Sequence, residues 1–188
     1  MALPLPARRA AAYEDLAAIP EHFVGEIIDG ELYTSPRPGA HHARAASRLG
    51  ATLDGPFDQG RGGPGGWIIL DEPELHLTGQ AMVPDLAGWR RTRMPVLPEV
   101  AAFELAPDWI CEVLSPGTEA LDRSLKMPRY AEAGVSHAWL IDPRSRSLEV
   151  YERRAGGFHL LAQHRDTALV QVVPFEVVPI ELAVLWER

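Results

Sequence analysis

Two short apolar segments each carry one acidic residue where a charge is expensive. The segment MVPDLAGW (82–89) carries Asp85, and the segment PDWICEVLSP (107–116) carries Glu112. Both segments have the apolar, β-branched and aromatic content of buried strands. A charged group in a buried strand costs free energy unless it is paired or binds a metal ion. Two such acids on consecutive strands therefore suggest a cation held between them.

The type of cation follows from the type of ligand. Two carboxylates about 4 Å apart repel by roughly 4 kcal/mol at an effective dielectric constant of 20, and a divalent cation reverses that repulsion. Ligands that are all oxygen favour Mg²⁺ or Mn²⁺ over zinc. The alternative is that each acid pairs with a local arginine, since Arg90, Arg91 and Arg93 follow Asp85 closely. Spacing alone leaves both possibilities open.

A third segment, DRSLKMPRYAEAGV (122–135), adds a basic residue to this set. It places Asp122, Lys126 and Tyr130 four residues apart, which is one face of a helix. A lysine near a metal-bound phosphate can orient or activate the attacking water and stabilise developing charge. The ordinary alternative is a solvated helix lysine that pairs with Asp122.

Further candidates lie near the N-terminus and after the first acid. Glu26 and Glu31 flank a predicted turn and are candidates for another metal ligand, with Glu26 in the more apolar surroundings. His41 and His42 begin a predicted helix, where neighbouring side chains point about 100° apart, so at most one of them faces a site. The sequence has no HExxH or other histidine spacing typical of zinc. The run RRTR (90–93) could contact phosphates, although such a run more commonly forms a solvated loop.

Composition limits the range of functions. At 188 residues the chain suits one domain, 1–188, with a sizeable core. The net charge of −8 argues against a protein that holds nucleic acid by bulk electrostatics, but not against a nuclease with a local metal site. The single cysteine, Cys111, excludes an internal disulfide and is expected to be a small buried hydrophobe. No apolar run reaches the roughly 18 residues that span a bilayer, and no signal-peptide pattern is visible, so a cytoplasmic protein without a membrane segment is expected.

The elements that must position these residues can be read in order. In the first third we expect a short helix at 11–20, a hairpin at 22–36 around Asp29-Gly30, a helix at 39–55 that Gly55-Pro56 ends, and a Gly-rich connector at 59–66. In the middle we expect strands within 67–77, 82–89 and 107–116, a loop at 90–106, and a helix at about 119–133 that Gly134 ends. The last part should contain a strand at 137–142, a hairpin at 147–165 around Gly156-Gly157 and a short final segment at 179–188. Pro128 either bends the 119–133 helix or starts a new one at its first turn. The order of helix, three strands, helix and strand predicts an α/β fold with a mixed sheet, and a right-handed crossover between its two last strands.

Six motifs taken together resemble a known family. GEIIDGELY, VPDLAGW, CEVLSPGT, the Asp122–Lys126–Tyr130 spacing, AGV and AWLIDP occur in order over about residues 13–186. They are similar to the Uma2 family, also called DUF820, whose bacterial members are classed as restriction endonucleases within the PD-(D/E)XK nuclease superfamily. The resemblance implies a restriction-endonuclease-like core, αβββαβ, flanked here by an N-terminal helix and hairpin. It also implies magnesium-dependent hydrolysis of phosphodiester bonds in DNA.

The resemblance assigns roles to four residues. Asp85 matches the motif aspartate and Glu112 the motif glutamate, and both would hold Mg²⁺ or Mn²⁺. Glu26 matches an early glutamate that would complete the acidic site, directly or through water. The motif lysine falls on Leu114 in this sequence, and Lys126 from the next helix matches the lysine that the family supplies instead.

Three functions stay open at this point. The leading hypothesis is a metal-dependent DNA endonuclease. The second is a non-catalytic or regulatory binding protein that keeps the nuclease fold, and the third is a metal-dependent hydrolase of another phosphate ester. A homodimer is expected in addition, with the predicted hairpins as its interface. Because no recognition helix or second specificity domain is visible, a stand-alone sequence-specific restriction enzyme is not expected.

Overall fold

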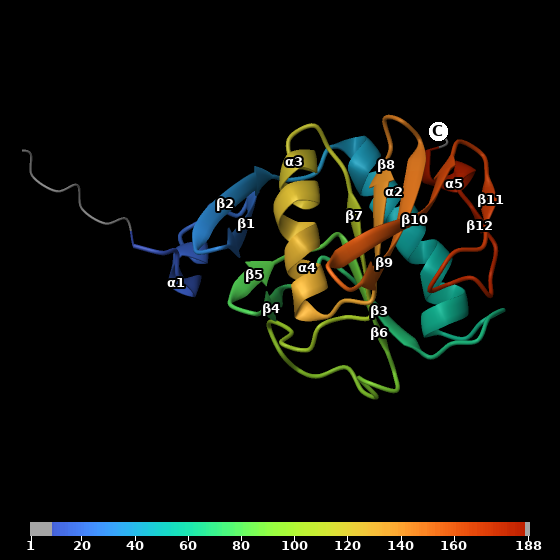
Figure 1. The fold of residues 1–188 in the computed structure, drawn as a ribbon, viewed down its shortest axis with the longest axis horizontal. Helices are drawn as coiled ribbons and strands as arrows, with labels where there is room; N and C mark the ends of the chain where they lie inside the picture. The colour runs from blue at the N-terminus through green and yellow to red at the C-terminus, as the bar shows by residue number, and fades with distance from the viewer. Residues whose placement is uncertain (1–8, 187–188) are drawn as a thin grey trace, which may run out of the picture.

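The computed structural model describes residues 9–186 and contains a six-stranded mixed sheet with helices on both faces (Figure 1). The strand order is β10-β9-β8-β7-β6-β3. These strands are β3 (Trp67–Asp71), β6 (Leu86–Arg90), β7 (Trp109–Val113), β8 (His137–Asp142), β9 (Ser147–Arg154) and β10 (Gly157–Arg165). Neighbours β7 and β8 are parallel, and the other neighbouring pairs are antiparallel. The predicted α/β class with a central mixed sheet is confirmed.

Two helical segments complete the core. Helix α2 (Ala40–Leu53) precedes β3. A continuous helical segment connects β7 to β8 and consists of α3 (Glu119–Leu121), the π-helical turn η2 (Asp122–Lys126) and α4 (Met127–Ala133). In Figure 1 this segment lies in front of the sheet and α2 lies behind it. The sequence α2, β3, β6, β7, α3–α4, β8 is the predicted αβββαβ order.

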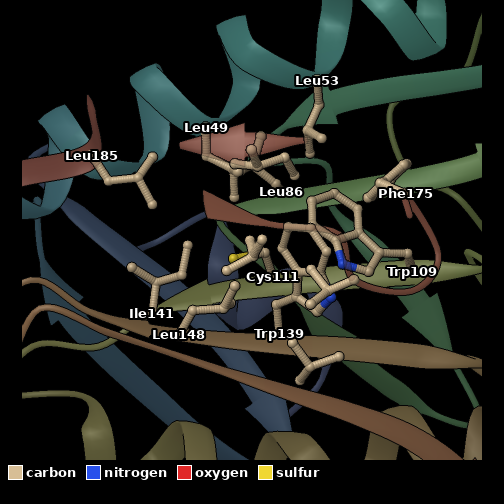
Figure 2. Close-up of a cluster of buried hydrophobic side chains, with 14 of the residues drawn as sticks. Leu49, Leu53, Leu86, Trp109, Cys111, Trp139, Ile141, Leu148, Phe175 and Leu185 are labelled. Atoms are coloured by element: carbon tan, nitrogen blue, oxygen red, sulfur yellow. The ribbon is translucent and has the colours of Figure 1, made fainter. Parts of the chain in front are cut away.

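Each face of the sheet has its own hydrophobic core, and β7 contributes to both. Trp109, Cys111 and Val113 point to the face that α2 covers, where they meet side chains such as Leu49 and Leu53 (Figure 2). The alternate residues of β7 point to the opposite face, toward α4. Cys111 is fully buried, and burial raises the pKa of its thiol well above the usual range. The expectation of a small buried hydrophobe is therefore confirmed.

A second, smaller sheet lies beside α4 and has the order β2-β1-β5-β4. It contains β1 (Phe23–Ile28), β2 (Glu31–Pro36), β4 (Leu75–Leu77) and β5 (Gln80–Met82). The predicted Asp29-Gly30 turn joins β1 to β2, and both residues have positive φ, 54° and 74°. Two consecutive positive φ values are what a tight two-residue hairpin requires, and asparagine, aspartate and glycine adopt them best. The hairpin directs Glu26 on β1 toward α4.

The helix at 119–133 starts and stops as predicted, but its middle is a π-helical turn. Pro128 lies in the first turn of α4, directly after η2, so it starts a new regular segment instead of bending one. Gly134 ends α4 in the left-handed conformation, with φ 96°. Short π-helical turns are frequent at functional sites, and this one contains both Asp122 and Lys126.

Two details differ from the sequence-based expectation. Asp85 does not lie within a strand but in the bend directly before β6. Gly55-Pro56 does not end the helical path, because a π-helical turn, η1 (Asp54–Asp58), follows α2.

The final segment begins with strand β12 (Ile180–Glu181), which pairs with β11 (Leu169–Val170), and continues as α5 (Ala183–Trp186). Helix α1 (Tyr13–Leu16) is present but short. Across residues 9–186, each helix is too short or too polar to cross a membrane.

Candidate functional site

Asp85 and Glu112, the acids of the two apolar segments, lie opposite each other at the point where β6 begins beside β7. These strands are antiparallel with Leu86 opposite Cys111, so Asp85 and Glu112 follow as the next opposed positions. The Val113 backbone N–H donates a 2.6 Å hydrogen bond to Oδ2 of Asp85, which ties the bend before β6 to β7. Glu112 is 2% exposed and lies inside a strand. Glu112 lies within β7 as predicted, whereas Asp85 lies one residue before β6, opposite Glu112 in the continued register.

Lys126 reaches this pair from the helix. Its Nζ lies 2.9 Å from Oε1 of Glu112 and 2.9 Å from Oε1 of Glu26, and it donates to the Val83 carbonyl at 3.0 Å. The side chain is 3% exposed, so the reading of a solvated helix lysine is wrong. A lysine that is displaced by 12 positions from the motif site at Leu114 therefore still contacts the motif glutamate.

The other two residues on this helix face also belong to the cluster. The Tyr130 hydroxyl donates a 2.8 Å hydrogen bond to Oε1 of Glu112, the same oxygen that Lys126 contacts. Asp122 lies 3.7 Å from Lys126 Nζ, and both residues are buried. The predicted spacing of four residues thus brings all three helix side chains to one place.

Burial perturbs the ionisation of this cluster strongly. Burial raises the pKa of Glu112 well above its usual range. The neighbouring acids raise this pKa further, whereas the positive charge of Lys126 lowers it only in part. Burial raises the pKa of Asp122 to about 6, again against Lys126. Burial alone would lower the pKa of Lys126, but Glu112 and Glu26 outweigh it and hold that pKa well above the usual range. The site therefore holds more acid than its lysine neutralises.

Sequence named both His41 and His42 without indicating which of them faces the site, and it did not predict the contact of His42 with Asp85. His42, in the first turn of α2, places its Nε2 3.3 Å from Oδ1 of Asp85. The sequence feature that points to His42 is its spacing from Ala45 and Leu49, which follow it by three and seven residues and therefore lie on the same buried face of α2. His41 points elsewhere and is exposed. Only one of the two histidines faces the site, as their adjacency predicts.

These side chains surround a small cavity of about 60 Å³. Its lining includes one lysine, one histidine and five acids, which are Glu26, Glu72, Asp85, Glu112 and Asp122. A buried water occupies roughly 10–15 Å³ on such a measure, so the cavity holds a few waters or a cation with part of its hydration shell. A wider hollow of about 600 Å³ shares three lining residues with it, Val24, Glu72 and Val83, and also includes Arg37.

The arginine run lies away from the site, and its charges are used locally. It follows Asp85 by the length of β6, roughly 17 Å at about 3.3 Å per residue. Arg90 lies over the ring of Trp67 at 4.4 Å. Arg91 pairs with Asp58 at 2.7 Å, and Arg93 pairs with Asp108 at 3.1 Å. The alternative in which local arginines neutralise Asp85 and Glu112 is therefore wrong: their partners are His42, a backbone amide, Lys126 and Tyr130.

The two hairpin glutamates separate in the structure. Glu26 is 5% exposed and lines the cavity, where its Oε1 accepts a 2.8 Å hydrogen bond from the Val83 backbone N–H. Glu31 is exposed at the turn end of β2 and does not line the cavity. Of the two candidates for a further ligand, the geometry keeps Glu26 near the acids.

Comparison with known proteins identifies the family. The model of the family Uma2, described as "Putative restriction endonuclease", matches residues 10–184. The chain belongs to the Uma2 family. A solved structure described as "a putative nuclease belonging to DUF820" from Anabaena variabilis is similar in fold, with a TM-score of 0.73 and 22% sequence identity over 92% of this chain and 96% of that chain. No curated protein matches this chain.

Restriction-endonuclease-like proteins generally use divalent metal ions, and the donor set here fits one. Among residues 9–186, no three His, Cys, Asp or Glu side chains form a preassembled cation site. Mg²⁺ does not require one, since it usually keeps several waters and binds one or two carboxylates together with substrate phosphate. Asp85, in the bend before β6, and Glu112, in β7, supply two carboxylates, and the excess of acid around the cavity is the condition that a divalent cation relieves.

Proposed function

We propose that this Uma2 protein is a divalent-metal-dependent nuclease that hydrolyses phosphodiester bonds of DNA, with Mg²⁺ or Mn²⁺ as its cofactor. The observation that carries the proposal is the convergence of Asp85, Glu112 and Lys126, from three separate elements, on one cavity. A structural ion pair would need one acid for one lysine. Four acids of low exposure, Glu26, Asp85, Glu112 and Asp122, surround a single lysine and a histidine here, which is a costly arrangement for a protein that binds no cation. The fifth acid, Glu72, is 45% exposed and pairs with Arg37.

Asp85 and Glu112 are the residues proposed to hold the metal. Lys126 and Tyr130 both contact Oε1 of Glu112, which leaves Oε2 as the oxygen available to a cation. Oδ2 of Asp85 accepts from Val113 and Oδ1 faces His42 at 3.3 Å, so a cation would use the remaining lone pair of Oδ1. When bound, a divalent cation polarises a phosphoryl oxygen and lowers the pKa of a coordinated water.

Lys126 is proposed to orient the attacking water and to stabilise the charge that develops on the phosphate. Two acids and a carbonyl fix its ammonium group, so little reorganisation is needed during reaction. Glu26 contacts Lys126 directly, which supports a role in holding that lysine. Its role as a metal ligand, directly or through water, stays a prediction.

Substrate length, assembly and location complete the proposal. The cavity is too small for a nucleotide, so only the reacting phosphate would enter it and the rest of a strand would lie outside. The net charge of −8 argues for contact with DNA over a short length. The homodimer and the cytoplasmic location expected from sequence stay predictions.

Cleavage of supercoiled and single-stranded DNA tests the proposal. We expect cleavage with Mg²⁺ or Mn²⁺ that EDTA abolishes and that Asp85→Asn or Glu112→Gln removes. Lys126→Ala should lower turnover by roughly 10²–10³, the usual loss for one transition-state stabiliser. Arg91→Met is the matched control, since it removes a cation outside the site. Circular dichroism confirms that each variant is folded.

Each other outcome identifies an alternative. Turnover of nucleotides or other small phosphate esters, without cleavage of polymers, would support a hydrolase of another phosphate ester. Cation binding that depends on Asp85 and Glu112, without turnover of any substrate, would support the non-catalytic binding protein. Parental cleavage by Lys126→Ala would remove the lysine from the mechanism.

A further inference from the structure

His42 contacts the site in a way that the proposed chemistry does not yet use. Its Nε2 lies 3.3 Å from Oδ1 of Asp85, and its side chain is 12% exposed. Its other ring nitrogen, Nδ1, is buried and has no hydrogen-bond partner among the described residues. The ring lines the same cavity as Glu112 and Lys126. A histidine in this position either binds the cation itself or orients a residue that does.

The buried Nδ1 distinguishes these two roles. A ring that binds a cation through Nε2 must carry its proton on Nδ1, and a buried N–H without an acceptor costs about 1–3 kcal/mol. With the proton on Nε2, Nδ1 is also left unsatisfied, as an acceptor, but Nε2 then presents N–H to the carboxylate of Asp85, whereas an unprotonated Nε2 would place two acceptors 3.3 Å apart. In that form the Nε2–H is directed at Asp85. The geometry therefore favours a donor over a ligand.

The contact of Nε2 with Oδ1 of Asp85 at 3.3 Å gives this donor a purpose. Oδ2 already accepts from the Val113 backbone N–H at 2.6 Å, which fixes one oxygen against β7. A donor at Oδ1 fixes the other oxygen and with it the rotation of the carboxylate. Asp85 needs such a restraint, because it lies in a bend and not in the ladder of β6. Carboxylates that bind metal ions are commonly held by such neighbouring donors.

We propose that His42 is a positioning residue that orients Asp85 for cation binding through its Nε2–H, without binding the cation itself. This inference rests on the proposed metal-dependent function, and it assigns α2 a direct part in the site. It also explains why a histidine continues the buried face of α2 formed by Ala45 and Leu49.

Titration of Mn²⁺ into the purified protein, followed by calorimetry, tests the proposal. We expect His42→Ala to weaken Mn²⁺ binding by roughly 10–100-fold, the usual effect of removing a donor to a metal-binding residue. His42→Gln should restore part of the affinity, because its amide can donate to Asp85. His41→Ala is the matched control, since it removes the adjacent but exposed ring, and it should bind as the parent does. Unchanged binding by His42→Ala would overturn the proposal.

Pulsed electron paramagnetic resonance of the bound Mn²⁺ separates the two roles directly. The expected spectrum of the parent lacks the coupling of a directly bonded ring nitrogen. A nitrogen coupling that His42→Ala removes would make His42 a ligand and would overturn the positioning role. Absence of Mn²⁺ binding in the parent would count against the proposed function itself.

A metal-free measurement keeps the His42 proposal testable in that case. Chemical unfolding in EDTA is compared for His42→Ala, Asp85→Asn and the double variant. If the two residues interact, the effects of the single changes on the unfolding midpoint are not additive. Additive effects would mean that His42 does not hold Asp85, whether or not a cation binds.

Discussion

The two ends of β6 carry opposite charge and use it in different ways. At its start, Asp85 joins a buried cluster around Lys126 in which acids outnumber bases. At its end, Arg90, Arg91 and Arg93 each make a separate local contact. Arg91 and Arg93 remain 44% and 40% exposed, whereas Lys126 is 3% exposed. Sequence alone already favours the acidic end, because an acid in an apolar run is costly, and burial explains why that end is the consequential one.

The difference follows from the cost of removing charge from water. An exposed ion pair contributes about 0–1 kcal/mol, because water and salt screen it. A buried pair contributes little net stability, yet losing one partner leaves a charge that nothing compensates. The acidic end of β6 should therefore respond strongly to single substitutions and to pH, and the basic end weakly. Three measurements test that contrast.

The largest effect is expected from Lys126→Met. Methionine keeps most of the volume of the lysine but removes the charge that Glu26, Glu112 and Asp122 share. Stranding buried acids in this way costs about 3–5 kcal/mol of unfolding free energy. Urea unfolding at pH 8 in EDTA measures it, with the fluorescence of buried tryptophans such as Trp139 as the signal.

Arg129→Met is the matched control for this change. Arg129 lies on the same helix and pairs with Asp29 and Glu132, but its side chain is 26% exposed. We expect a loss of about 1 kcal/mol or less. Equal losses for the two variants would contradict a special role for burial at Lys126.

The same contrast explains how much could be predicted from the sequence. Asp85 and Glu112 were identifiable because an acid within an apolar run is costly. The hairpin turn and the end of the crossover helix were identifiable because Asp29-Gly30 and Gly134 adopt positive φ angles, which few other residues tolerate. The reach of Lys126 to Glu112 could not be predicted, since it depends on how the crossover helix packs against the sheet.

The contacts of His42 and of the arginine run could not be predicted for a related reason. The contact of His42 with Asp85 joins residues that are far apart in the sequence, and only the packing of α2 brings them together. The arginines were near Asp85 in sequence, but an extended strand carries them to the other end of the sheet. Local spacing determines which face a residue occupies, whereas tertiary packing determines what that face meets.

An intermediate effect is expected from pH, through Asp122. Its pKa rises from 3.8 to about 6 on folding, so the folded protein binds the proton more tightly than the unfolded chain does. Such a group stabilises the fold fully below its unfolded pKa, and this contribution is lost as the pH rises through the folded pKa. At about 1.36 kcal/mol per pKa unit the full contribution is about 3 kcal/mol, of which about 2 kcal/mol is lost between pH 4 and pH 7.

Asp122→Asn tests this contribution. Because asparagine is neutral at all these pH values, the variant should lack this part of the pH dependence and gain stability relative to the parent above pH 6. Unfolding by urea at pH 4, 5, 6 and 7 measures the difference between the two proteins. A constant difference across that range would mean that Asp122 does not titrate differently in the folded state.

The smallest effect is expected at the basic end of β6, from Arg91→Met. Arg91 pairs with Asp58, whose other carboxylate oxygen accepts a hydrogen bond from the Ile69 backbone N–H, so Asp58 keeps a partner when the arginine is removed. The pair is also partly exposed, and we expect a loss below about 1 kcal/mol that shrinks further in 1 M salt. Urea unfolding at low and high salt measures it beside Lys126→Met, whose loss should persist in salt because the buried cluster is screened less. If Arg91→Met were as costly as Lys126→Met and as insensitive to salt, exposure would not be what separates the two ends of the strand.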